Sequence, residues 1–122
     1  MGFDINITLN VWIDETTGLP FVYGKGSEKL PYVPCTYEVP EKYRKYLKQR
    51  GSIFHFYIKN IEGYTTDVGT FLHHYPDWRQ VKKDMGAEGE EDYGWTKADH
   101  DGFKQALKWL DSKQVFGITW SY

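Results

Sequence analysis

The sequence contains one cysteine, no long apolar run and no segment that resembles a signal peptide. Cys35 cannot form a disulfide within the chain, which is typical of proteins from a reducing compartment. A membrane-spanning helix needs about 20 consecutive apolar residues, and no run approaches that length. The first residues, MGFDIN, lack the basic and apolar regions of a secretory signal. We therefore expect a soluble cytoplasmic protein without a membrane partner.

An excess of basic residues is also lacking. The 15 lysines and arginines are outnumbered by 17 aspartates and glutamates, which gives a formal net charge of -2. Proteins that bind duplex nucleic acid normally carry a basic excess on the binding domain. We therefore expect that duplex nucleic acid is not the partner of this protein.

Complete catalytic and cofactor motifs are missing as well. There is no G-x-S-x-G, and the glycines of GKG at 24–26 lack the spacing of a phosphate-binding loop. Cys35 lies in a proline-rich segment, VPCTYEVP, without a helix start that would supply oxyanion donors. The acidic run at 88–92 is typical of a solvated loop. The sequence favours a non-enzymatic protein with no catalytic residue, no metal site and no cofactor.

Aromatic residues, in contrast, are abundant. They make up 18% of the chain, as 5 Trp, 10 Tyr and 7 Phe. Aromatic side chains fill small cores and also recur at binding surfaces, so composition does not separate these two uses. With 122 residues, the chain is long enough to bury a core, and we expect one domain over residues 1–122.

Four segments have the pattern of β-strands. Residues 3–14 alternate between apolar and polar residues, which predicts a strand with one buried face. A turn at 15–18, with Gly18 free to adopt a positive φ, joins it to a strand at 19–24 and predicts a hairpin. Residues 52–61 and 114–122 are rich in aromatic and β-branched residues and predict two more strands. The predicted buried face of the first strand consists of Phe3, Ile5, Ile7, Leu9, Val11 and Ile13.

Four further segments have helical patterns, and residues 24–39 between the strands and helices predict an irregular loop. Pro76 is predicted to begin one helix and Thr66 to cap another. Thr96 and Asp99 form a capping box at the start of the last helix. The predicted helices are 41–50, about 67–74, about 76–85 and the segment that follows Thr96.

The order of these elements is β-β-α-β-α-α-α-β, in which strands and helices do not alternate regularly. This order predicts an α+β fold. We expect a mostly antiparallel sheet of about four strands with three to four short helices packed on one face.

The four histidines do not form a metal or catalytic motif. His73 and His74 are adjacent and stand about 100° apart on a helix, so we expect the pair not to chelate one ion. His100 occupies the position at which it packs against Trp95 in a hydrophobic staple. His55 falls within a predicted strand. Convergence of these histidines with carboxylates from distant segments stays open, and a small metal-dependent hydrolase built from them is an alternative function.

Basic residues gather in two segments although the net charge is small. The helix at 41–50 carries five basic residues against one acidic residue, Glu41. Basic and aromatic side chains together suit a phosphate-bearing small molecule or an acidic protein surface, and they also occur on ordinary solvated helices. The predicted binding residues are Tyr43, Arg44, Lys45, Lys48, Trp78 and Arg79.

Three stretches, MGFDINITLNVWIDETTGLPF, PEKYRKYL and FLHHYPDW, resemble the small, compact, aromatic-rich accessory proteins that tailed bacteriophages encode. The resemblance implies an accessory role in the host cytoplasm, such as inhibition of a host defence protein or sequestration of a nucleotide signal. It transfers no binding residue to this chain.

The sequence therefore favours a binding protein whose partner is a host protein or a phosphate-bearing small molecule. One alternative is the metal-dependent hydrolase, and another is a weak nucleic-acid-binding module that uses the basic helix at 41–50. An exposed aromatic strand face around Trp12 also allows a homodimer.

Overall fold

A computed structural model describes residues 4–24, 26–47, 54–87 and 94–121. Its main sheet has the strand order β1-β6-β5. The central strand β6 (Phe116–Ser121) is antiparallel to β1 (Asp4–Leu9) and to β5 (Thr65–Asp67). The two ends of the chain meet in this sheet, because β1 pairs with β6 from Asp4↔Ser121 to Leu9↔Phe116.

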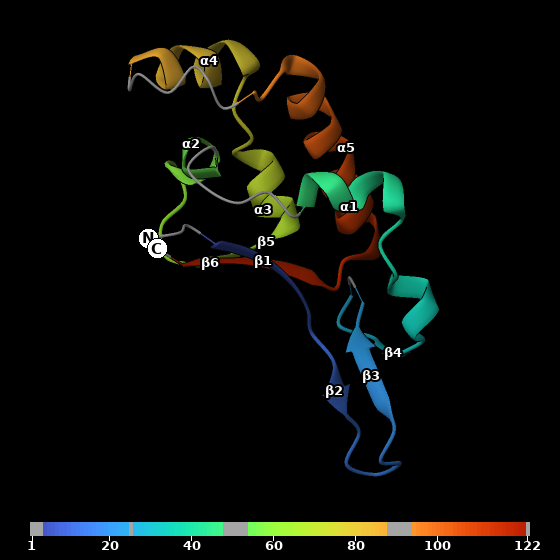
Figure 1. Cartoon of the computed structure of the whole chain (residues 1–122). Coiled ribbons are helices and arrows are strands. Elements are labelled where there is room, and N and C mark those ends of the chain that lie inside the picture. Colours follow the sequence, from blue (N-terminus) through green and yellow to red (C-terminus); the bar gives the residue numbers. More distant parts are fainter. Residues whose placement is uncertain (1–3, 25, 48–53, 88–93, 122) are drawn as a thin grey trace.

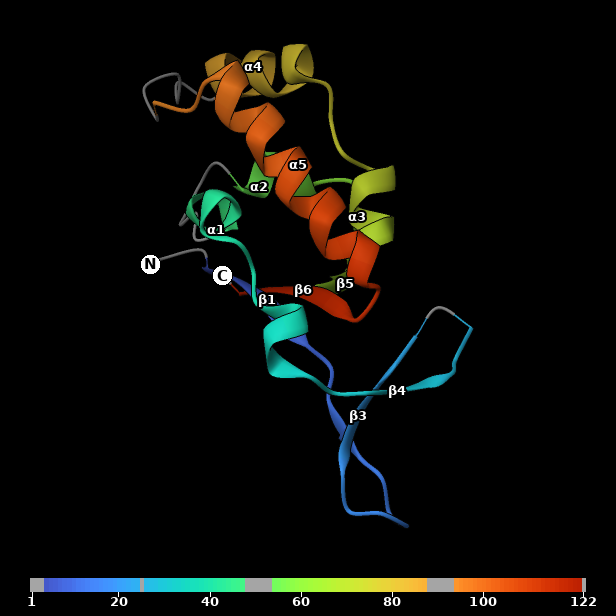
Figure 2. The ribbon, with the colours of Figure 1, turned by 90° about the vertical axis from the view of Figure 1, so that its right-hand side faces the viewer.

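The helices lie on one face of the main sheet (Figure 1). The long helix α5 runs obliquely across this layer, as the second view shows (Figure 2). The arrangement confirms the predicted α+β fold. None of the described helices is long and apolar enough to cross a bilayer. The described helices are α1 (Glu41–Leu47), α2 (His55–Ile58), α3 (Val68–His73), α4 (Trp78–Ala87) and α5 (Lys97–Lys113).

The core lies between the helices and β6. Alternate residues of β6, Phe116, Ile118 and Trp120, are buried, whereas Gly117 and Thr119 between them are partly exposed. This alternation means that one face of the sheet supports the helices and the other faces away from them. Buried residues on the helix side include Val68, Phe71, Phe103, Leu107 and Leu110.

A second antiparallel sheet has the order β2-β3-β4, and Figure 1 shows it projecting away from the helices. Its strands are β2 (Trp12–Ile13), β3 (Pro20–Tyr23) and β4 (Lys29–Pro31). We call residues 11–33 the arm. The predicted turn is confirmed: Gly18 has a φ of 72°, and its N–H donates to the carbonyl of Asp14 at 2.8 Å.

The predicted strand at 3–14 is wrong in one respect, because it is divided between the two sheets. The first part of this segment, β1, pairs with β6, which begins at Phe116 opposite Leu9. Pairing with the main sheet therefore stops at Leu9. The chain then leaves the core and enters the arm. Val11 and Ile13, predicted to be buried, are 39% and 64% exposed. Two three-stranded sheets therefore replace the single sheet of about four strands.

The predicted strand at 52–61 is also wrong, because its described part contains the short helix α2. Phe54, Phe56, Tyr57 and Ile58 are all buried, whereas a half-buried strand would expose alternate residues. A short apolar run fits a buried helix as well as a strand, so its composition alone does not distinguish them.

Several helix ends differ from the prediction by one or two residues. Asp67, not Thr66, caps α3 by accepting the N–H of Thr70 at 2.7 Å, because Thr66 belongs to β5. α4 begins at Trp78 instead of Pro76. The capping box of Thr96 and Asp99 at the start of α5 is confirmed. The segment predicted to be irregular contains β4 and a 3-10 helix, Pro34–Tyr37, whereas the acidic run at 88–92 lies outside the described residues.

The contact between α1 and α5 depends on Gly102, where a Cβ atom would overlap the ring of Tyr46. We expect Gly102→Ala to lower the free energy of unfolding by about 1–3 kcal/mol through overpacking. Alanine normally stabilises a helix interior by about 1 kcal/mol relative to glycine, so the expected sign is reversed here. Urea denaturation measures the change. In a Tyr46→Ala background the same substitution should be neutral or stabilising, and equal losses in both backgrounds would contradict this contact.

Candidate functional site

The basic residues Lys42, Arg44 and Lys45 of α1 are exposed, and the contacts of Lys42 and Arg44 are local. The Nε of Arg44 donates to the carbonyl of Val39 at 2.8 Å, and its Nη2 lies 3.3 Å from a carboxylate oxygen of Glu38. Lys42 lies over the ring of Tyr43, and Lys45 lies over that of Tyr46, at 5.0 and 4.8 Å from the ring centroids. Lys48, also predicted to bind, lies outside the described residues.

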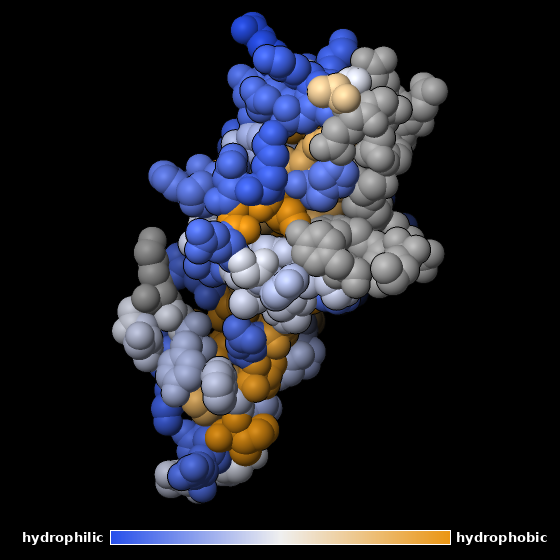
Figure 3. All heavy atoms as spheres, turned by 90° about the vertical axis from the view of Figure 1, so that its left-hand side faces the viewer, coloured by the Kyte–Doolittle hydropathy of each residue, from blue (hydrophilic) through white to orange (hydrophobic). Residues whose placement is uncertain are grey.

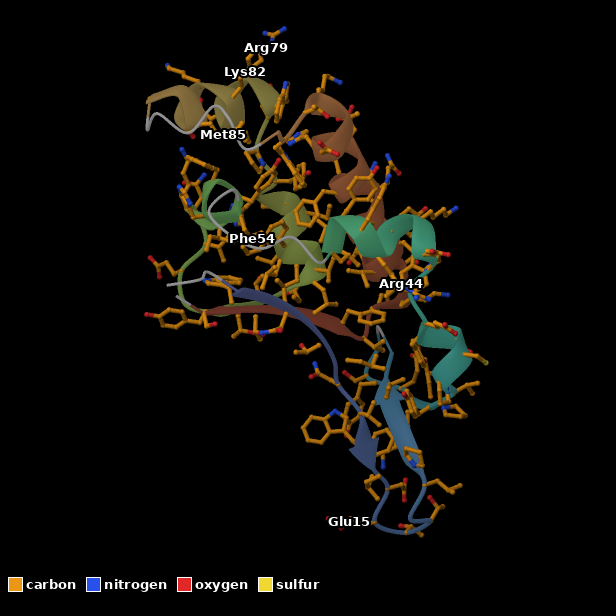
Figure 4. All side chains as sticks on the ribbon, viewed as in Figure 1. Glu15, Arg44, Phe54, Arg79, Lys82 and Met85 are labelled. Atoms are coloured by element: carbon orange, nitrogen blue, oxygen red, sulfur yellow. The ribbon has the colours of Figure 1, made fainter. Side chains whose placement is uncertain are left out.

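The two halves of the predicted binding surface lie apart. Figure 4 shows Arg79 on α4 at one end of the molecule and Arg44 on α1 well away from it. Trp78 is half-buried, and its ring centroid lies 5.4 Å from that of His100, so much of this indole belongs to the core. The structure therefore does not join Tyr43, Arg44 and Lys45 with Trp78 and Arg79 into one surface.

The residues with the most perturbed chemistry form a buried network around Tyr57. The indole N–H of Trp95 donates to the Tyr57 hydroxyl at 2.8 Å, and this hydroxyl lies 2.8 Å from Nδ1 of His100. The hydroxyl of Tyr75 donates to the carbonyl of His100 at 2.5 Å. Trp95 and His100, predicted to pack together, therefore meet through Tyr57.

Burial keeps this network neutral. It raises the pKa of the Tyr57 and Tyr75 hydroxyls far above the usual tyrosine value of 10.0. It lowers the pKa of His100, which is only 5% exposed, below the usual 6.5. The Tyr57 hydroxyl and Nδ1 of the neutral imidazole share a hydrogen bond, and the Tyr57 oxygen accepts from Trp95, so each of these groups has a partner. The network therefore contributes hydrogen bonds within and at the edge of the core.

The other histidines lie nearer the surface. His73 and His74 are exposed, with ring centroids 5.1 Å apart and planes at 84°. His55 is partly buried against Phe56. Within the described residues, no three His, Cys, Asp or Glu side chains lie close enough together to hold a metal ion. The described residues therefore add no support to the metal-dependent alternative.

The arm is the part of the molecule where apolar side chains remain exposed. Eight large apolar residues of the described chain are exposed, and all except Tyr64 belong to the arm. Figure 3 shows apolar residues over the lower end of the molecule, where the arm projects. Ile13 and Leu19 are 64% and 63% exposed, and Trp12 is 55% exposed. The other exposed apolar residues of the arm are Val11, Tyr23, Leu30 and Val33.

The exposure follows from the architecture of the arm. Strand alternation places Trp12 and Ile13 on opposite faces of a sheet that is only three strands wide. Phe21 and Val22 in the central strand β3 are buried, but every residue of the outer strands β2 and β4 is exposed. The sequence pattern did not reveal this exposure, because apolar and polar residues alternate in the same way in a strand that another layer covers and in one that is left uncovered.

Lowering the pH from about 7 to 5 should destabilise the protein through His100. Well above pH 6.5 the imidazole is neutral in both the folded and the unfolded state, and the network contributes its full stability. As the pH falls through 6.5 towards the lowered pKa of the folded state, the unfolded chain binds the proton first. The free energy of unfolding should therefore decrease by at most about 1.4 kcal/mol per pH unit.

Urea denaturation at a series of pH values measures this effect. His100→Gln should remove the decrease, whereas the matched control at an exposed histidine, His73→Gln, should retain it. The lowered pKa values of Asp14, Asp67, Asp84 and Asp101 act in more acidic solution, below the usual 3.8, so they do not obscure the result. Equal pH dependence in wild type and His100→Gln would contradict the role of the network.

No protein-family model, curated protein or solved structure matched this chain. The function must therefore be inferred from the surface of the molecule itself. In the described residues the buried Tyr57 network is hydrogen-bonded, the basic residues are dispersed, and the exposed apolar residues are concentrated in the arm.

Proposed function

We propose that this is a non-enzymatic binding protein that docks on another protein through the end of its arm. The observation that carries the proposal is the concentration of exposed apolar side chains on a hairpin that projects from the body. Contiguous exposed apolar surface on a folded domain is characteristic of an interaction site.

The arm can be covered by a partner without any change in the core. Val22 is the arm residue that is fully buried in the core cluster, whereas Ile13 and Leu19 are outside this cluster, so contact at these two residues does not compete with folding. Ile13 and Leu19 lie beside the turn at the end of the arm, and covering each would contribute about 1.5–3 kcal/mol. A few such residues at the centre of a contact are enough to dominate the binding energy.

The resemblance to phage accessory proteins supports a host protein of the cytoplasm as the partner, with inhibition of a defence system as the outcome. A projecting hairpin with apolar side chains on both faces suits insertion into a groove of such a partner. A nucleotide signal is less well supported, since the basic residues of α1 and α4 lie apart (Figure 4).

Replacing Ile13 and Leu19 together by glutamate should weaken partner binding at least about 100-fold, because two covered apolar side chains become charged. The fold should be unaffected, since both residues are already exposed. Affinity capture from host lysate followed by biolayer interferometry with the captured protein measures the change.

Tyr64→Glu is the matched control, because Tyr64 is as exposed as Ile13 but lies outside the arm. It should bind like wild type. Sedimentation of the protein alone tests the homodimer. If wild type is a dimer and the arm variant is a monomer, the partner of the arm is a second copy of this chain and not a host protein. Equal capture by wild type and the arm variant would show that the arm is not the contact.

A further inference from the structure

A cleft of about 720 Å³ lies between the base of the arm and the face of the main sheet that is turned away from the helices. Residues of β1, β5 and β6 form its floor, and Trp12 and Tyr23 of the arm form a wall. The volume is in the range of small-molecule sites, which is about 300–1,000 Å³. A second pocket of about 320 Å³ shares Gly24, Asp67 and Gln114 with the cleft and extends it past the end of α5.

Threonine hydroxyls line the floor because of the sheet register. Ile118 and Trp120 are buried under the helices, so Thr119 between them faces the cleft. Thr65 is opposite Thr119, and Thr8 is opposite Gly117 in the next row. Gly117 leaves the floor open, since a Cβ there would lie 3.2 Å from the Thr8 hydroxyl oxygen.

These polar side chains make no hydrogen bonds within the described residues. The side chains of Thr8, Thr119, Asn10 and Gln114 have neither a donor nor an acceptor partner there. Asn10 and Gln114 take part in hydrogen bonds through their backbone N–H groups, so their amide side chains stay available. The cleft thus offers several hydroxyl and amide groups to a ligand.

The wall is aromatic and open to solvent. Trp12 and Tyr23 are 55% and 43% exposed, with ring centroids 6.1 Å apart and planes at 63°. A ligand that fits between this wall and the polar floor needs one apolar face and a polar rim. A pyranose ring has this character, because its C–H groups form one face and its hydroxyls project around the edge.

The charge of the cleft favours a neutral ligand. No lysine or arginine is present among its described lining residues. The carboxylate of Asp67 is already occupied, since it accepts the N–H and the hydroxyl of Thr70 at 2.7 and 2.8 Å. A phosphate would find no opposite charge among these residues, whereas uncharged hydroxyls would be matched.

Gln114 adds an independent observation. It ends α5 in the left-handed conformation, with a φ of 59°, where glycine is normally preferred. Strain of this kind often persists at functional sites. The amide of Gln114 lines the cleft, so a residue that is unfavourable for the helix end supplies a donor and an acceptor to the site.

We propose that this cleft binds a neutral carbohydrate. A pyranose ring stacks on Trp12, and its hydroxyls form hydrogen bonds with Thr8, Thr119 and Gln114. The site uses Trp12 and Tyr23, whereas the protein contact proposed above uses Ile13 and Leu19, which do not line the cleft. The two proposals can therefore fail separately.

Saturation-transfer NMR and calorimetry with the full chain test the proposal. The probes are glucose, galactose, mannose, N-acetylglucosamine, lactose and chitobiose, with adenosine, uridine and adenosine monophosphate for comparison. At least one saccharide should bind with a Kd on the order of 1 mM, as expected for a small polar ligand. Binding of the nucleosides or the nucleotide in place of the saccharides, or no binding at all, would overturn the proposal.

Variants then locate the site. Trp12→Ala should weaken saccharide binding at least about 10-fold, and Thr119→Val about 3-fold or more, through loss of stacking and of one hydrogen bond. Tyr64→Ala and Thr36→Val are the matched controls, since both residues are exposed and lie outside the cleft.

Gln114→Gly separates binding from folding. It should raise the Tm, because glycine relieves the left-handed helix end, and it should weaken saccharide binding. An unchanged affinity in Trp12→Ala, or in both Thr119→Val and Gln114→Gly, would show that the saccharide binds elsewhere and would overturn the assignment of this cleft.

Discussion

The pairing of β6 with β1 and β5 is the constraint on which the rest of the structure depends. β6 supplies Phe116, Ile118 and Trp120 to the core on one face and the floor of the cleft on the other. It also begins opposite Leu9, which ends the pairing of β1 and directs the following residues into the arm. The residue at which β6 begins therefore determines both the composition of the core and the point at which the arm leaves it.

The Tyr57 network and the arm present opposite conditions. The Tyr57 network joins residues 38 and 43 positions apart in the chain, and it uses their hydrogen-bonding groups within the core. The arm shows the opposite condition, because Ile13, Leu19 and Trp12 stay exposed. Recognition is therefore expected at the arm, and the histidine with the most perturbed environment contributes to stability.

The arm has two distinct regions. Its end presents aliphatic side chains on a narrow hairpin, which suits a protein groove. Trp12 and Tyr23 form an aromatic wall beside a floor of hydroxyl groups, which suits a small polar ligand. Neither region resembles the basic surface that α1 suggested, since Arg44 is held by Val39 and Glu38 and lies away from Arg79 (Figure 4).

The sequence by itself determined the features that depend on neighbouring residues. These are the hairpin turn with Gly18, the capping box of Thr96 and Asp99, and the α+β class. The tertiary structure decided where the alternating residues 3–14 divide between two sheets. The alternation of apolar and polar residues is the same in both sheets, so it does not show where one ends and the other begins. It also decided that the apolar run around Phe56 is helical, and that Tyr57, Trp95 and His100 meet. Such contacts join distant segments, and no local pattern encodes which segments will be covered and which left exposed.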